Sequence, residues 1–118
     1  MAAWYAPLPL AAAEREFIKH RSEYETVVHL AATHRLAEHR ECLYGLELPP
    51  EYRHLTQYCI QSVDKPALAI AFDPPTTRRL IIYAATPQAL AALRNCCLDG
   101  SIYKQLDLNW YIFTEAQD

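Results

Sequence analysis

The sequence predicts an α+β domain: a long N-terminal helical region followed by βββαβ, in a mostly antiparallel sheet with helices on one face. Three observations favour this fold. No glycine or proline lies between Pro9 and Gly45, the residues after Gly45 form short β-branched and aromatic runs, and Thr86, Pro87 and Gly100 bracket one further helix. With 118 residues, 52% of them apolar or aromatic, residues 1–118 are expected to fold as a single domain.

Residues 10–44 carry the strongest helical pattern. Apolar residues recur every seventh position, and the stripe then shifts near Thr33: Leu10, Phe17, Tyr24 and Ala31 come before the shift, Leu36 and Leu43 after it. An unbroken helix of this length would be about 50 Å long, while a domain of this size has a radius of gyration of about 13 to 14 Å. The region is therefore one bent helix or two, unless it projects and meets a partner.

The next segment predicts the start of the sheet. Leu48 to Glu51 contains two prolines that stop the helix, and one further turn can run to Leu55. Residues 56–63 are rich in β-branched and aromatic side chains and are assigned to a strand, with a helix over residues 50–62 as the alternative. A turn at Asp64-Lys65 follows.

Two further strands are expected at residues 67–72 and 79–84. In the first, Leu68, Ile70 and Phe72 point one way and three alanines the other, so the large side chains would face the core and the alanine face would admit another backbone. The second is almost continuously apolar, which suits an interior strand.

The last helix has the clearest boundaries in the sequence. Thr86 suits the N-cap, Pro87 the first helical position and Gly100 the position just after the C-terminus. A connection over residues 101–109 then leads to a final strand at residues 108–114.

The composition indicates the cellular compartment in which the protein is expected. No stretch reaches the about 20 uncharged apolar residues of a membrane span, and the apolar start lacks the basic region of a signal peptide, so we expect a cytoplasmic protein. The four cysteines show no CxxC pair and no disulfide-framework spacing, which favours free thiols. Cys96 and Cys97 would point about 100° apart on a helix, and Cys97 is interpreted as a small buried hydrophobe.

A metal site is one alternative for the helical region. His34, Glu38 and Cys42 fall at i, i+4 and i+8 and would share one helix face. We favour a solvated face with arginine–glutamate pairs instead, and expect no metal or other cofactor.

Catalysis and nucleic-acid binding find little support. The sequence has no nucleophile elbow, no HExxH and only two glycines, so no catalytic residue is assigned. Its net charge is −3, and Arg78-Arg79 is its one adjacent basic pair, so a nucleic-acid-associated protein is the second alternative, with nucleic acid not expected as the partner.

Protein binding is the function that this elimination leaves. Eight tyrosines and two tryptophans suit an interface, and the expected contact residues are Trp4, Tyr5, Phe17 and Tyr24. We therefore expect a small non-enzymatic interaction module, such as an inhibitor, immunity or accessory protein, with a protein partner or a homodimer formed through the N-terminal helical region. The first alternative is a small enzyme or ligand-binding domain with a pocket between sheet and helices and histidines as its polar groups.

Overall fold

The computed structural model describes residues 11–116, which form one six-stranded sheet and two α-helices. The elements in chain order are α1 (Ala12–Ala32), β1 (Gly45–Leu46), the 3-10 helix η2 (Pro50–Leu55), β2 (Ile60–Val63), β3 (Ala69–Phe72), β4 (Leu80–Ala84), α2 (Pro87–Cys97), β5 (Gly100–Asp107) and β6 (Trp110–Glu115). The sheet order is β1-β2-β3-β4-β6-β5 and every neighbouring pair is antiparallel. This confirms the predicted α+β class with an antiparallel sheet.

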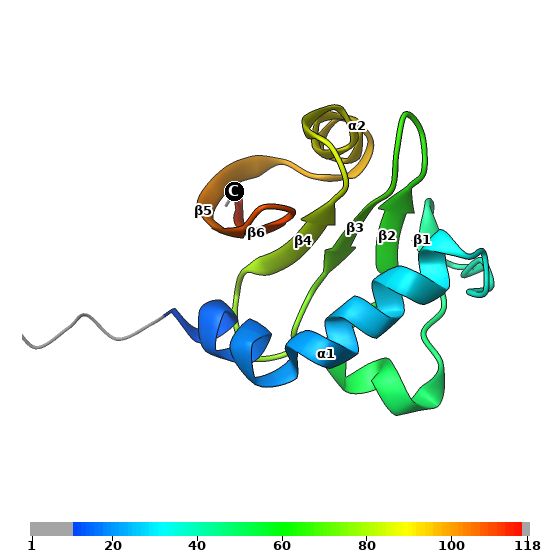
Figure 1. Ribbon diagram of the computed structural model, residues 1–118, viewed down its shortest axis with the longest axis horizontal. Coiled ribbons are helices and arrows are strands. Elements are labelled where there is room, and N and C mark those ends of the chain that lie inside the picture. Colours follow the sequence, from blue (N-terminus) through cyan, green and yellow to red (C-terminus); the bar gives the residue numbers. More distant parts are fainter. Residues whose placement is uncertain (1–10, 117–118) are drawn as a thin grey trace, which may run out of the picture.

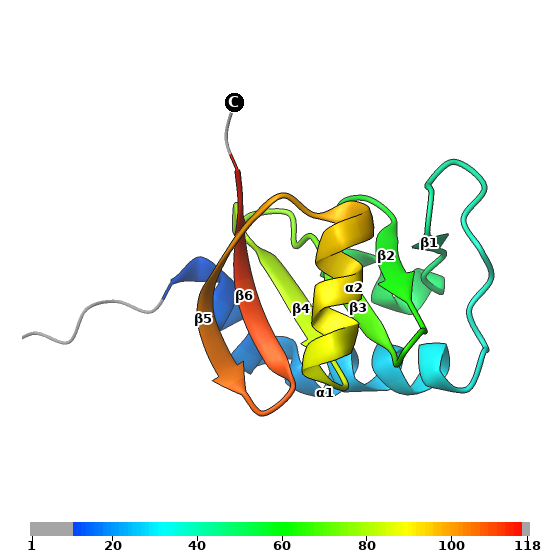
Figure 2. The same ribbon diagram turned by 90° about the horizontal axis from the view of Figure 1, so that it is seen from above.

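The two helices lie on opposite faces of the sheet, α1 on one and α2 on the other (Figures 1 and 2). The prediction that both would cover one face is wrong. Ile70 and Phe72 of β3 pack in the core beside α1, whereas Ala69 and Ala71 belong to a second core beside α2. The small alanine side chains let α2 approach the strand closely, as the alternation predicted, and both faces of β3 are buried.

Four aromatic side chains meet in the core beneath α1. Phe17 and Tyr24 of the helix meet Phe72 and Trp110 of the sheet, with ring centroids 4.9 Å apart for Phe17–Trp110 and for Tyr24–Phe72. All four side chains are buried. The apolar residues that recur at every seventh position therefore form the stripe that packs α1 on the sheet.

Helix α1 ends at Ala32, and residues 34–44 are not helical. Within the helix, only His20 departs from helical dihedral angles among the described residues, at φ −116° and ψ 20°. The predicted phase shift near Thr33 thus marks the end of the helix rather than a bend. No described helix has the length and hydropathy to cross a bilayer.

All four predicted strands begin later than expected, and two further strands were not predicted. The predicted turn to Leu55 is the 3-10 helix η2, and only Ile60–Val63 of residues 56–63 is strand. β1 and β5 were not foreseen, and β5 occupies most of the expected connection over residues 101–109.

The predicted caps of α2 hold at its start. The Thr86 hydroxyl accepts a hydrogen bond from Ala89 N at 3.0 Å, and Pro87 opens the helix. At the other end Leu98 is extended, and Gly100 begins β5 with φ +149°. Gly100 is therefore a strand glycine rather than the C-terminal cap.

Candidate functional site

Residues 37–47 form an irregular hairpin at the β1 edge of the sheet. Glu47 N donates to Ala37 O at 2.8 Å, His39 N donates to Gly45 O at 2.9 Å, and a single bridge pairs Glu38 with Leu46. We call this segment the tethered hairpin, because a disulfide joins its tip to the residue before β2.

That disulfide links Cys42 to Cys59, whose Cα atoms are 6.5 Å apart. A second disulfide joins the neighbours Cys96 and Cys97, so all four cysteines are oxidised and the prediction of free thiols is wrong. The first pair forms because the chain after α1 folds back along the sheet edge instead of continuing as a helix. The second joins the last two residues of α2, just before the backbone becomes extended at Leu98.

The same fold removes the metal site considered on the helical region. His34, Glu38 and Cys42 lie outside any helix, so their spacing no longer places them on one face. The Cys42 sulfur is bonded to another sulfur and cannot serve as a thiolate ligand.

A tight turn closes the tip of the tethered hairpin. Gly45 N donates to Cys42 O at 3.0 Å, which leaves Leu43 and Tyr44 at the two central positions. Tyr44 has φ +58°, in the left-handed region that asparagine and glycine usually occupy. A side chain at Gly45 would collide with Cys42, so the turn requires glycine there.

Large apolar side chains are exposed around this disulfide. Leu43 is 78% exposed, Tyr58 69% and Tyr44 51%. Leu43 follows Cys42 and Tyr58 precedes Cys59, so the disulfide brings these residues to one end of the molecule. We call Leu43, Tyr44 and Tyr58 the apolar tip.

A hollow of about 770 Å³ lies between the tethered hairpin, the end of α1 and the turn from β2 to β3. Three half-buried leucines that also pack against the core under α1 contribute to its lining: Leu36, Leu46 and Leu68. Ionisable side chains, His34 and His39 among them, also line it, as do Leu43 and Tyr44 of the apolar tip.

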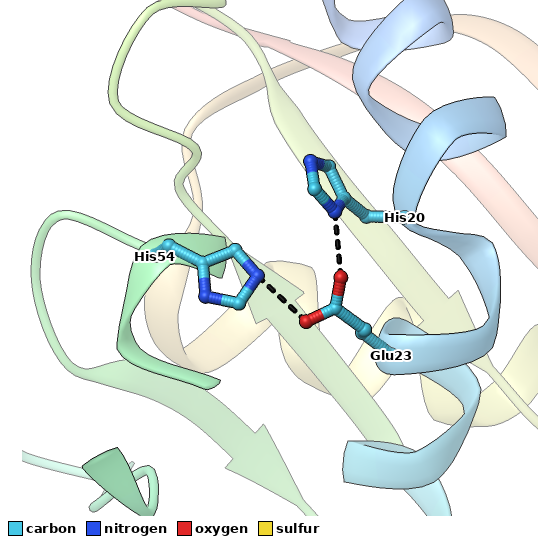
Figure 3. A group of neighbouring side chains, drawn as sticks. All are labelled: His20, Glu23 and His54. Atoms are coloured by element: carbon cyan, nitrogen blue, oxygen red, sulfur yellow. Dashed lines mark hydrogen bonds and ion pairs between the residues drawn. The ribbon is translucent and has the colours of Figure 1, made fainter. Parts of the chain in front are cut away.

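A separate cluster joins α1 to η2 (Figure 3). The Glu23 carboxylate lies between two imidazoles, with Oε1 2.6 Å from His20 Nδ1 and Oε2 2.7 Å from His54 Nε2. The two rings meet edge to face, with centroids 5.2 Å apart. We call His20, Glu23 and His54 the His–Glu–His cluster; among the described residues it is the one group of three or more potential metal ligands whose donor atoms lie within 4.8 Å of one another.

A second carboxylate supports the cluster from the helix side. Glu16 Oε2 is 3.8 Å from His20 Nε2 and accepts a hydrogen bond of 3.2 Å from the Tyr24 hydroxyl. Burial, followed by the charge and hydrogen bond of Glu16, raises the pKa of Tyr24 far above its ordinary value. The hydrogen bond from His20 is the main reason that the pKa of the Glu23 carboxyl lies below its ordinary value.

No family model, curated protein or solved structure matches this chain. The apolar tip, the hollow beside the tethered hairpin and the His–Glu–His cluster are therefore the features that bear on function.

The structure describes two of the four residues that the sequence suggested for protein binding. Trp4 and Tyr5 lie outside the described residues. Phe17 and Tyr24 are buried in the core under α1, which argues against both as contact residues.

Sequence reasoning missed the apolar tip and the His–Glu–His cluster. If the pairing of Cys42 with Cys59 had been predicted, the apolar residues next to these cysteines would have been expected to lie close together. The i, i+3 spacing of His20 and Glu23 is visible in the sequence, but their meeting with His54 depends on how η2 packs.

Proposed function

We propose that this chain is a small protein-interaction module, of the inhibitor, immunity or accessory type, that binds a protein partner through the apolar tip. The observation that supports this is the exposure of Leu43, Tyr44 and Tyr58 around one disulfide. Single exposed apolar residues are ordinary on protein surfaces, whereas a group of them is a feature of interaction sites.

The chemistry of the apolar tip suits an anchor that enters a pocket on a partner. Tyrosine is enriched among the residues that dominate interface energies, because its ring buries a large area and its hydroxyl stays polar. The exposed Arg40 and Glu41 beside the turn would form part of a polar rim. The Cys42–Cys59 disulfide limits the freedom of the turn before binding, so less conformational entropy is lost in the complex.

A ligand-binding or enzymatic domain is the second candidate, and the hollow of about 770 Å³ beside the tethered hairpin is what favours it. Binding pockets usually combine an apolar lining with a few converging polar groups. Apart from half-buried His39, the charged and histidine residues that line this hollow are exposed, so the hollow has no enclosed polar group that could fix a ligand. The interaction proposal is therefore preferred.

The structure weakens the case for nucleic-acid binding through the adjacent pair Arg78-Arg79. The Arg79 guanidinium lies 4.0 Å from the centre of the Tyr103 ring, and its Nε donates to the Thr114 hydroxyl at 3.2 Å. Of the adjacent arginine pair, Arg78 is exposed and Arg79 is half-buried. One exposed arginine does not make the clustered positive face that phosphate binding needs.

Two further predictions stay untested. A cytoplasmic location is one, and the two disulfides argue against it, because such bonds persist mainly in oxidising compartments. A homodimer through the N-terminal helical region is the other, and the apolar stripe that would form it packs on the domain's own sheet.

The test compares partner capture by three disulfide-bonded proteins from a nuclease-treated extract of the host at moderate salt. These are the wild type, a tip variant with Leu43→Ser and Tyr58→Ser, and a control variant with Ile18→Ser and Leu108→Ser. The control residues are also large, apolar and exposed, at 62% and 77%, but lie on α1 and in the turn between β5 and β6. All four are surface positions, so both variants should stay within about 0.5 kcal/mol per substitution of wild-type stability.

We expect one protein to be captured in stoichiometric amount by the wild type and the control variant, and to be lost or strongly reduced with the tip variant. Capture that the tip variant retains, or that both variants lose equally, would contradict binding through the apolar tip. If nothing is captured and a small molecule stabilises the wild type instead, the ligand-binding candidate replaces the proposal.

A further inference from the structure

We propose that the His–Glu–His cluster is a binding site for one divalent transition-metal ion, with zinc as the best fit. The ligands would be His20 Nδ1, a carboxylate oxygen of Glu23 and His54 Nε2. This inference is independent of the apolar tip and of any protein partner.

The first argument is the donor set. Two imidazole nitrogens and one carboxylate oxygen are ligand types that zinc uses in sites with three protein ligands, where a water or another donor fills the fourth position. The donor atoms all lie within 4.8 Å of one another. Zinc–ligand bonds of about 2.1 Å place tetrahedral ligand atoms about 3.4 Å apart, so shifts of about 1 Å would admit the ion.

The second argument is that one cation can take the place of both hydrogen-bond protons in the cluster. Each contact between Glu23 and an imidazole nitrogen, at 2.6 and 2.7 Å, holds only if that nitrogen carries a proton. A metal ion can replace both protons, because it attracts the carboxylate and two unprotonated nitrogens at once. His20 and His54 would then bind as neutral rings, each with its remaining proton on the other nitrogen.

The third argument is the support around His20. A histidine that binds a metal through one nitrogen commonly donates the N–H of the other nitrogen to a carboxylate, which fixes the orientation of the ring. With Nδ1 on the ion, His20 Nε2 faces Glu16 Oε2 at 3.8 Å. The buried Tyr24 in turn donates to that same oxygen at 3.2 Å, so the outer carboxylate is itself held in place.

The fourth argument is access. The side chain of His54 is 46% exposed and that of Glu23 is 33% exposed, so an ion can enter from solvent. His20 and Glu23 come from α1 and His54 from η2 (Figure 3), so the ion would cross-link two elements that are distant in sequence.

The test is calorimetric titration of zinc chloride into untagged protein that has been stripped with chelator and keeps both disulfides, so that no thiolate competes for the metal. The wild type should bind one equivalent. His20→Ala and His54→Ala should each weaken binding by more than the roughly 10- to 100-fold loss typical of changes to supporting residues, and Glu16→Gln should fall within that range. His29→Ala, an exposed histidine of the same helix outside the cluster, is the matched control and should bind as the wild type does.

Two readouts keep the test decisive if a variant loses structure. Imidazole ¹⁵N spectra of the wild type should show zinc on Nδ1 of His20 and Nε2 of His54. Zinc should also raise the thermal midpoint of the wild type and of His29→Ala but not that of Glu23→Gln, which preserves the shape of the side chain.

Three results would overturn the proposal. The first is no binding at the highest zinc concentration that the protein tolerates. The second is binding that survives both His20→Ala and His54→Ala, and the third is a loss in His29→Ala as large as that in His54→Ala.

Discussion

Removal of the Cys42–Cys59 disulfide should destabilise the domain strongly, whereas removal of the Cys96–Cys97 disulfide should not. The first bond joins residues separated by 17 positions, and the second joins neighbours. In the chain-entropy description, closing a loop of the first size lowers the entropy of the unfolded chain enough to stabilise the fold by about 3 kcal/mol. A bond between adjacent residues closes almost no loop.

The comparison uses Cys42→Ala/Cys59→Ala and Cys96→Ala/Cys97→Ala. Urea denaturation followed by circular dichroism should give a free energy of unfolding about 3 kcal/mol below wild type for the first variant, with a thermal midpoint roughly 10 to 20 °C lower. The second variant should stay within about 1 kcal/mol of wild type. Equal losses in the two variants, or no loss in the first, would refute the assignment of the stabilisation to loop closure.

Three single substitutions test other parts of the structure. Glu23→Gln should be less stable than wild type at about pH 7 but equally stable at about pH 2. The hydrogen bond from His20 lowers the pKa of Glu23 in the folded state. The ionised carboxylate therefore stabilises the fold above the ordinary carboxyl pKa, and this stabilisation is lost as the pH falls through the folded-state pKa. Urea midpoints at the two pH values measure this, and an equal difference at both would contradict it. Gly100→Ala should cost about 3 kcal/mol or more in the same assay, because the new Cβ would meet the backbone of β6 at a positive φ; a change below about 1 kcal/mol would show that the strand pair relaxes. Tyr24→Phe should cost about 1 kcal/mol by loss of the hydrogen bond to Glu16, and an unchanged stability would mean that this contact contributes nothing.

The sequence predicted the elements whose signals are local. The start of α2 follows from Thr86 and Pro87, and the alternation around Ile70 and Phe72 identified a strand with one face of small residues. The sequence did not predict the second core, which lies between the sheet and α2. Because one strand face carried large side chains, only that face was assigned to the core, although the alanine face is buried under α2 as well.

The missed strands are both edge strands, and their patterns explain the omission. β1 has only two residues, and β5 has two register shifts against β6, between Ile102 and Lys104 and between Gln105 and Asp107. Such irregularities break the period of two on which strand prediction depends. They also make an edge less able to pair with another chain.

The candidate sites were less predictable than the fold, because each is assembled from distant segments. The apolar tip depends on a disulfide between two cysteines whose spacing in the sequence does not indicate that they pair. The His–Glu–His cluster depends on η2, which carries His54 to the face of α1 that holds His20 and Glu23. No periodicity within a single segment encodes either meeting.

The strand order has a consequence for folding during synthesis. β6 lies between β4 and β5 in the sheet, yet it is the last of these strands to leave the ribosome. Until residues 110–115 emerge, β4 has no neighbour on one side, and its run Leu80–Ala84 presents unpaired backbone groups with apolar side chains. The nascent chain therefore carries an aggregation-prone edge for the time needed to add about 30 residues, roughly 2 to 6 seconds at ordinary synthesis rates. A chaperone that binds the emerging chain would be most useful in this interval.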